Sequence, residues 1–132
     1  MEPASKFTKV LLVDDHALIR QRLRDALDQH RDVQVVGEAS TGVEAVQYVR
    51  TLQPDVVVMD LSMPAMDGLR ATRLIKEEHP RITVIGLSFF GTTMTRDALI
   101  NAGASTLLMK EHAAEDLYST IQLCLQGPGP TR

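Results

Sequence analysis

Short apolar runs recur along the chain, and a segment with helical spacing follows each of them. The runs are rich in Val, Leu and Ile and occupy residues 8–13, 33–36, 55–60, 82–87 and 106–109. Apolar runs bounded by turn-forming residues are typical of strands buried on both faces of a sheet. The segments between them place apolar residues three and four positions apart, which is typical of amphipathic helices. We therefore predict strands and helices in strict alternation.

Local signals set the boundaries of the second predicted helix. Thr41 and Glu44 have the spacing of a capping box, in which each side chain satisfies a free backbone donor at the helix start. The helix should then run to about Leu52. Its predicted buried positions are Val43, Val46, Tyr48 and Val49.

Glycine and proline mark the ends of the later elements. Pro80 ends a helix predicted over residues 68–79, and Gly103 is expected to stop a helix over 92–102 in a left-handed conformation. The last helix, over 113–126, stops before a Gly-Pro-Gly-Pro sequence that cannot continue it. Within the fourth strand, Gly86 is expected to permit close packing against a helix.

Strict alternation of strands and helices predicts an α/β protein with a parallel sheet and helices on both faces. The number and length of the units favour a flavodoxin-like (βα)5 doubly wound sheet with strand order 2-1-3-4-5. In that topology the ligand crevice lies between the first and third strands. Residues 1–126 are expected to form one domain, in which residues 1–6 are a loose leader. Residues 127–132 are expected to form a Gly/Pro linker or flexible tail.

Composition narrows the classes of function. The chain has 132 residues, of which 44% are hydrophobic and 23% charged, as in a globular domain. Its net charge of −3 provides no basic surface for nucleic acid, so any contact with DNA would have to come from another domain. A single cysteine, Cys124, excludes an internal disulfide. Without a signal-peptide pattern or an apolar run of membrane length, we expect a cytoplasmic location.

Polar residues follow or end most of the predicted strands. Asp14 and Asp15 follow the first strand, Asp60 ends the third, and Ser88 and Lys110 follow the fourth and fifth. Three neighbouring carboxylates would repel one another unless a cation lies among them, and oxygen ligands suit Mg²⁺. A lysine and a serine can stabilise charge on a transferring phosphoryl group. The set therefore predicts that Asp60 is a nucleophile that accepts phosphate.

Each of these residues also has a simpler interpretation. An aspartate after a strand often only caps the next helix, which applies to Asp15. Ser88 alone is more typical of a loop and Lys110 alone of a solvated surface. Their joint placement at the ends of neighbouring strands favours the site. The histidines have no metal-ligand spacing, and we do not assign them a catalytic role: His16, His30, His79 and His112.

The chain resembles the CheY-like receiver domains of bacterial two-component response regulators. The residues that carry the resemblance are 10–16 (VLLVDDH), 54–68 (PDVVVMDLSMPAMDG), Ser88 and 103–110 (GASTLLMK). Asp-Asp-His after the first strand and Glu111 after the lysine resemble the NarL/LuxR-type subgroup, whose members usually carry a C-terminal helix-turn-helix domain.

The resemblance implies a role for each site residue. Asp60 would take a phosphoryl group from a sensor histidine kinase, and Lys110 would pair with the phosphoryl oxygens. Asp15 and Asp60, with the backbone carbonyl of Ser62, would bind Mg²⁺, and Asp14 would assist through water. The chain would assist only its own phosphorylation and autodephosphorylation and would have no other enzymatic activity.

The resemblance also implies a switch, but this sequence departs from the usual pattern. Ser88 would turn toward the phosphoryl group and change the surface formed by the fourth helix, fifth strand and fifth helix. In the family, an aromatic switch residue usually lies three positions before the lysine, and here that position is occupied by Leu107. Phe89 and Phe90 follow Ser88, where a small residue is common, and we expect one to be buried and one partly exposed.

The implied partners are a sensor histidine kinase, a second copy of the chain, and DNA only through an output domain absent from this sequence; no membrane is expected. The Gly-Pro ending resembles the start of an interdomain linker, so we expect a receiver from a longer transcription regulator. One alternative is a phosphorylation-independent receiver that acts as a dimerisation or protein-interaction module. Another is a phosphohydrolase on the same scaffold.

Overall fold

The computed structural model describes residues 7–61, 63, 67–89 and 93–126. Within these ranges the strands are β1 (Thr8–Val13), β2 (Val33–Ala39), β3 (Val56–Asp60), β4 (Thr83–Ser88) and β5 (Thr106–Met109). The helices are α1 (Ala17–Asp28), α2 (Gly42–Leu52), α3 (Asp67–Glu78), α4 (Thr93–Asn101) and α5 (Ala113–Gln126). The predicted leader and tail lie outside the described residues.

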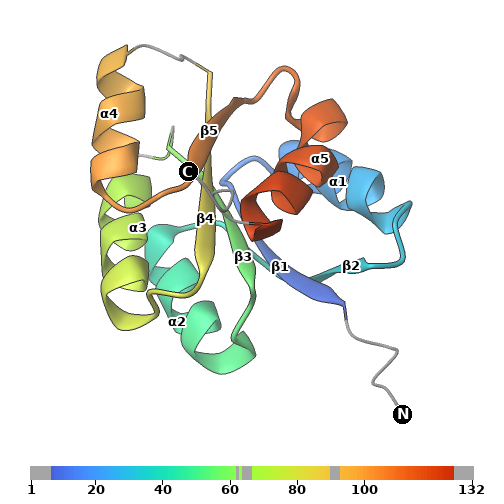
Figure 1. Cartoon of the computed structure of the whole chain (residues 1–132), viewed down its shortest axis with the longest axis horizontal. Coiled ribbons are helices and arrows are strands. Elements are labelled where there is room, and N and C mark those ends of the chain that lie inside the picture. The colour runs from blue at the N-terminus through green and yellow to red at the C-terminus, as the bar shows by residue number, and fades with distance from the viewer. Residues whose placement is uncertain (1–6, 62, 64–66, 90–92, 127–132) are drawn as a thin grey trace.

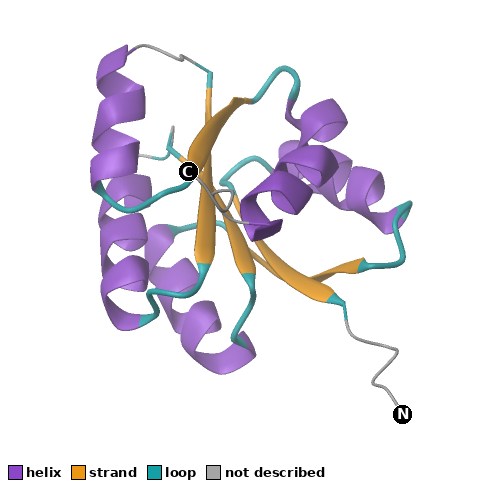
Figure 2. Ribbon diagram, in the orientation of Figure 1, coloured by secondary structure: helices purple, strands orange, loops and turns teal. Residues whose placement is uncertain are grey.

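The five strands form one parallel sheet in the order β2-β1-β3-β4-β5. Helices α2, α3 and α4 cover one face of the sheet, and α1 and α5 cover the other (Figure 1). In Figure 2 the strands form a twisted central layer between these two groups of helices. The predicted fold class and strand order are confirmed.

Alternate residues of the central strands supply two separate hydrophobic cores. In β1, Leu11 and Val13 belong to the core beneath α2, α3 and α4, whereas Val10 and Leu12 belong to the core beneath α1 and α5. All of β3 is buried, as expected for a strand with helices on both sides. No helix in the described part of the chain is both long enough and apolar enough to cross a membrane.

The start of α2 has the predicted capping box. Thr41 Oγ1 accepts a hydrogen bond from the Glu44 backbone N–H at 3.1 Å. Glu44 Oε1 accepts one from the Ser40 backbone N–H at 2.8 Å. The hydrogen bonds that Glu44 accepts from the backbone and hydroxyl group of Ser40 stabilise its charged form and lower the pKa of its carboxyl group. The left-handed conformation predicted at Gly103 is also present, with φ of 112°.

Two of the four predicted buried positions in α2 are wrong. Val43 is 64% exposed and Tyr48 is 37% exposed, while Val46 and Val49 are buried. The buried stripe of α2 runs through Ala45 instead, because only this side of the helix faces the sheet. In α5, Leu125 is likewise more exposed than its spacing suggested.

Strand β2 is longer than the predicted run at residues 33–36. It continues to Ala39 because Gly37, Glu38 and Ala39 pair with the last three residues of β1. The charged Glu38 and the flexible Gly37 obscure this half of the strand in the sequence. Residues 37–39 are extended because their backbone pairs with β1, although Gly, Glu and Ala have a low intrinsic preference for strands.

Gly86 provides the close approach between β4 and α4 that its position predicted. A Cβ atom added at Gly86 would lie 2.2 Å from Leu99 Cδ2. Leu99 is fully buried, so its side chain has little room to move away. A side chain at position 86 would therefore push α4 away from the sheet.

We predict that Gly86→Ala lowers the free energy of unfolding by about 1–3 kcal/mol, because it overpacks the core. Leu99→Val removes the clashing Cδ atoms, so the alanine should cost much less in that background. Urea denaturation of the two single variants and the double variant, followed by circular dichroism, measures the coupling. If the double variant loses as much free energy of unfolding as the two single variants together, the steric explanation is contradicted.

Candidate functional site

The register of β1 and β3 brings two predicted site residues together. Val13 pairs with Met59, so Asp14 comes directly after β1 at the level of Asp60, the last residue of β3. The Asp14 backbone N–H donates to the Ala39 carbonyl at 3.0 Å and so continues the sheet one residue beyond β1. Both carboxylates are therefore positioned by rigid backbone at the carboxyl edge of the sheet.

The neighbouring strands bring the other two predicted residues to the same edge. Ser88 ends β4 and pairs with Met109, and the Lys110 backbone N–H donates to the Ser88 carbonyl at 2.9 Å. Ser88 is buried, and so is Lys110. The expectation that these strand ends converge is thus met for Asp14, Asp60, Ser88 and Lys110.

Lys110 lies between the two buried carboxylates. Its Nζ atom is 3.0 Å from Asp14 Oδ2 and 3.0 Å from Asp60 Oδ1, and all three side chains are at most 1% exposed. Burying charges is expensive unless they are paired, and one ammonium group here serves two carboxylates. The buried cluster therefore keeps an excess of negative charge that a further cation would relieve.

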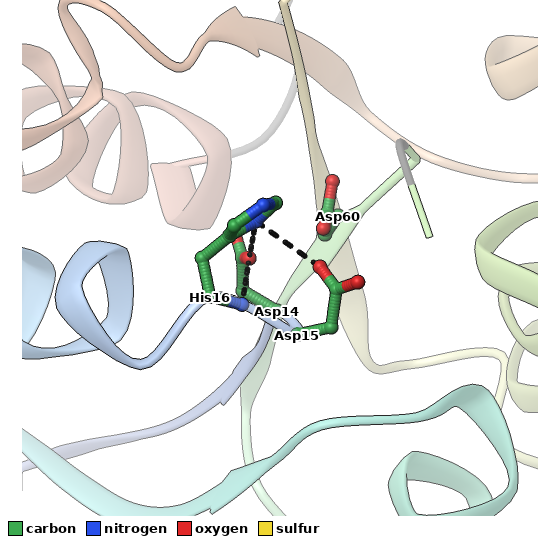
Figure 3. Close-up of side chains that lie close together, drawn as sticks. All are labelled: Asp14, Asp15, His16 and Asp60. Carbon is green, nitrogen blue, oxygen red and sulfur yellow. Dashed lines mark hydrogen bonds and ion pairs between the residues drawn. The ribbon is translucent and has the colours of Figure 1, made fainter. Parts of the chain in front are cut away.

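Asp15 and His16 complete the cluster from the loop after β1 (Figure 3). His16 Nδ1 lies 3.0 Å from Asp14 Oδ1 and 3.1 Å from Asp15 Oδ1. Helix α1 begins at Ala17 with His16 as its N-cap residue, and the His16 side chain makes no capping hydrogen bond. The interpretation of Asp15 as the N-cap is therefore wrong, and its carboxylate lies in the acidic cluster instead.

The donor set fits Mg²⁺. One ligand atom from each of Asp14, Asp15, His16 and Asp60 lies within 4.8 Å of the others. Two oxygens bound to one Mg²⁺ at about 2.1 Å each are at most about 4.2 Å apart, so small adjustments bring the carboxylates into range. Mg²⁺ prefers oxygen to imidazole, which leaves the three carboxylates as the donors. The predicted Ser62 carbonyl lies outside the described residues.

Two aromatic rings lie against Lys110, and neither is among the site residues predicted from the sequence. The Phe89 ring centroid is 4.8 Å from Lys110 Nζ, within the range of a cation–π contact. The rings of His16 and Phe89 meet edge to face, with centroids 6.3 Å apart. Phe89 is 42% exposed, as expected for one of the two phenylalanines; Phe90 lies outside the described residues. Adjacency to Asp15 and Ser88 is the signal that could have identified both rings.

An ion-pair network braces the loop that carries the first two aspartates. Arg20 Nη1 donates to the Asp14 carbonyl at 2.5 Å, and its Nε donates to Glu38 Oε1 at 2.8 Å. Arg24 Nε also donates to Glu38, at Oε2, at 2.8 Å. Burial raises the pKa of Glu38, but the hydrogen bonds and charges of the two arginines outweigh it and leave that pKa below its usual value. The brace thus stays charged at neutral pH.

Gly68 lets α3 begin against Asp60. A Cβ atom added at Gly68 would lie 2.2 Å from the Asp60 backbone carbonyl oxygen. Backbone cannot move aside as a flexible side chain can, so this position accepts only glycine without displacing Asp60. The sequence indicates only that Gly68 ends a loop. The structure shows that it also allows the start of α3 to lie directly against the Asp60 backbone.

A comparison with protein families supports the assignment that this geometry suggests. Residues 10–122 match the family model described as the response regulator receiver domain. The chain belongs to this family. The match includes the described members of the acidic cluster, Lys110 and both aromatic rings, so the receiver site and the residues that cover it lie in one domain.

Other receiver-containing proteins are similar over most of this chain. The transcriptional regulatory protein YhcZ of Bacillus subtilis is 36% identical over 115 residues, which are 87% of this chain and 54% of that protein. The response regulator VraR of Staphylococcus aureus is 35% identical over 119 residues, 90% of this chain and 57% of that protein. The chain therefore spans about half the length of these relatives.

Solved structures agree with the receiver fold. A two-component response regulator of the LuxR family from Aurantimonas sp. SI85-9A1 superposes with a TM-score of 0.86 at 30% identity. The superposition covers 92% of this chain and 87% of that one. The resemblance to LuxR-type response regulators drawn from the sequence is thus confirmed.

We predict that Lys110→Met destabilises the receiver by about 3–5 kcal/mol, because it leaves two buried carboxylates without their cation. Asp60→Asn should leave stability unchanged or higher, since Lys110 keeps Asp14 as its partner. Urea denaturation without divalent ions measures both. Lys110→Arg keeps the charge and is the matched control. If Lys110→Met and Asp60→Asn lower the free energy of unfolding by equal amounts, the site has no excess of negative charge.

Proposed function

We propose that this chain is a phosphoacceptor receiver whose Asp60 takes a phosphoryl group from a phosphohistidine of a sensor histidine kinase. The observation that supports this most directly is the buried Lys110 ammonium between Asp14 and Asp60, beside the carboxylate of Asp15. The arrangement holds a nucleophile, a positive charge and excess negative charge at one sheet edge. Phosphoryl transfer needs little more than such positioning and charge stabilisation.

The proposed step forms a bond between an Asp60 carboxylate oxygen and phosphorus while the bond from phosphorus to the donor imidazole breaks. The imidazole leaves with its electron pair, and Lys110 moves from the carboxylates to the phosphoryl oxygens. Bound by Asp15 and Asp60, Mg²⁺ would neutralise charge on those oxygens. In this proposal the chain assists only its own phosphorylation and dephosphorylation and acts on no free substrate.

The proposed signal begins at Ser88 and not at an aromatic switch. Phosphorylation adds a charge of about −1.5 to −2, which Ser88 can contact from the end of β4. Leu107 is buried in the core beneath α2, α3 and α4, where an aliphatic side chain has no polar group to swing outward. The change would therefore pass through the backbone of β4 to α4.

We also propose that the output is transcription, through a DNA-binding domain in a longer protein. The relatives support this, because one is a transcriptional regulatory protein and this chain spans only about half of it. The net charge of −3 supports it too, since the receiver itself offers little to DNA. A homodimer of receivers is part of the proposal.

Incubation of the chain with Mg²⁺ and acetyl phosphate tests the chemistry. Intact-mass spectrometry should show a gain of one phosphoryl group, which hydroxylamine removes as expected for an acyl phosphate. Asp60→Asn should show no gain, while Asp55→Asn, at an exposed aspartate before β3, should behave as the unchanged protein. No gain in any variant, with a dimer present throughout, would favour the phosphorylation-independent module. Steady hydrolysis of a phosphorylated metabolite that adds no phosphoryl group to the chain would favour the phosphohydrolase.

We predict that Phe89→Ala shortens the lifetime of the phosphorylated form several-fold. The Phe89 ring covers Lys110 on the side where it also meets His16, so its removal opens a path for water to the phosphoryl group. Phe89→Leu keeps an apolar cover and should retain most of the lifetime. Loss of the added mass over time, after removal of the phosphodonor, gives the rate. An unchanged lifetime in Phe89→Ala would show that the ring does not exclude water.

A further inference from the structure

A groove of about 520 Å³ runs between α2 and α3, away from the phosphoryl site. Its apolar lining comes from Val43 and Val46 on α2 and from Ala71 and Leu74 on α3. Val43 is 64% exposed and Leu74 is 38% exposed, so these two side chains add little to the core of the domain. Neighbouring exposed apolar side chains of this kind are typical of an interaction surface.

The rim of this groove is basic although the chain as a whole is acidic. Arg50, Arg70 and Arg73 line the groove together with one carboxylate, that of Glu77. Arg50 is neutralised by Glu78, with Nη2 to Oε2 at 2.7 Å. In the part of the chain that the structure describes, the side chains of Arg70 and Arg73 make no ion pair or hydrogen bond. Two guanidinium groups thus remain available beside the apolar lining.

The charge is also placed at one end of the groove. Arg70 lies in the first half of α3 and Arg73 at its middle, whereas Glu77 lies in its last turn. Helices α2 and α3 each follow a strand of the parallel sheet, and their N-termini add partial positive charge at the same end as Arg70. The rim therefore favours an occupant with carboxylates toward the N-terminal ends of α2 and α3.

We propose that the α2–α3 groove is a docking surface for an amphipathic helix of a partner protein that carries carboxylates beside its apolar stripe. The lining residues recur at helical spacing on both walls, and Val43 to Arg50 spans about 10 Å at about 1.5 Å per residue, or two turns. A groove between two helices accepts the apolar face of a third helix. None of its lining residues belongs to the phosphoryl site, so this proposal does not depend on the proposed function.

The probe is a fluorescein-labelled, side-chain-stapled peptide helix of three turns, with leucines at positions i, i+4 and i+7 flanked by glutamates. A second peptide with lysines in place of the glutamates is its control. By fluorescence anisotropy at low salt, the 132-residue chain should bind the acidic peptide at least about tenfold more tightly than the basic one. Raised salt should reduce this preference, because the rim charges are exposed. Amide shifts in nuclear magnetic resonance spectra should concentrate in α2 and α3.

Two groove variants separate the apolar and charged contributions. Leu74→Glu should weaken binding of the acidic peptide at least about tenfold, since it places a charge in the apolar lining. Arg70→Glu combined with Arg73→Glu should reverse the preference between the two peptides. Arg22→Glu combined with Arg31→Glu makes the same change in net charge at exposed positions outside the groove, and should leave the preference in place.

Several results would overturn the proposal. One is failure of both peptides to bind at millimolar concentration. Another is an equal loss of the preference for the acidic peptide in the groove charge variant and in the control charge variant. Sedimentation equilibrium that shows self-association abolished by Leu74→Glu would make a second copy the occupant. If neither peptide binds, but the chain floats with anionic vesicles and Leu74→Glu abolishes this flotation, the occupant of the groove would be a lipid surface. Circular dichroism of each variant establishes that it is folded before binding is measured.

Discussion

The structure depends on the balance of charge around one buried ammonium group. Lys110 reaches from the end of β5 to Asp60 on β3 and Asp14 after β1. Lys110 reaches across β4 to do so, and the observed strand order and register bring these strand ends to one edge of the sheet. Because two buried carboxylates share one cation, the site has an intrinsic demand for added positive charge. A bound cation would relieve this imbalance and so would stabilise the folded receiver.

Two structures at the edge of the site hold this cluster in place. On one side, Arg20 joins the Asp14 backbone to Glu38 on β2, so the loop after β1 is fixed by the sheet itself. On the other, the buried Lys110 Nζ lies 4.8 Å from the centroid of the Phe89 ring and 3.5 Å from His16 Nδ1. The brace limits where the aspartates can go, and the rings limit what can reach them. His16 takes part in both, because its Nδ1 atom also contacts the carboxylates of Asp14 and Asp15.

The sequence was sufficient to predict the fold and the inner site, because both follow from strand pattern. A buried strand that stops at a charged residue must place that residue at the sheet edge, which is why Asp14, Asp60 and Lys110 could be assigned. Val43 shows where this reasoning fails. Its spacing fits a buried stripe, but whether a helix position faces the sheet or a neighbouring helix depends on packing between distant segments. The contacts of His16 and Phe89 with Lys110 depend in the same way on side-chain directions that spacing does not contain.

If the receiver switches as proposed, the contact between Gly86 and Leu99 offers a route for the signal that needs no aromatic residue at position 107. Gly86 lies two residues before Ser88 on β4, and its missing side chain lets Leu99 of α4 rest directly on the strand. Close-packed interiors transmit small displacements, because there is no free volume to absorb them. A shift of β4 at Ser88 would therefore move α4 through Leu99, whereas Leu107 only fills the core beside it. An aromatic switch is one way to couple the site to this surface, and direct packing of helix on strand is another.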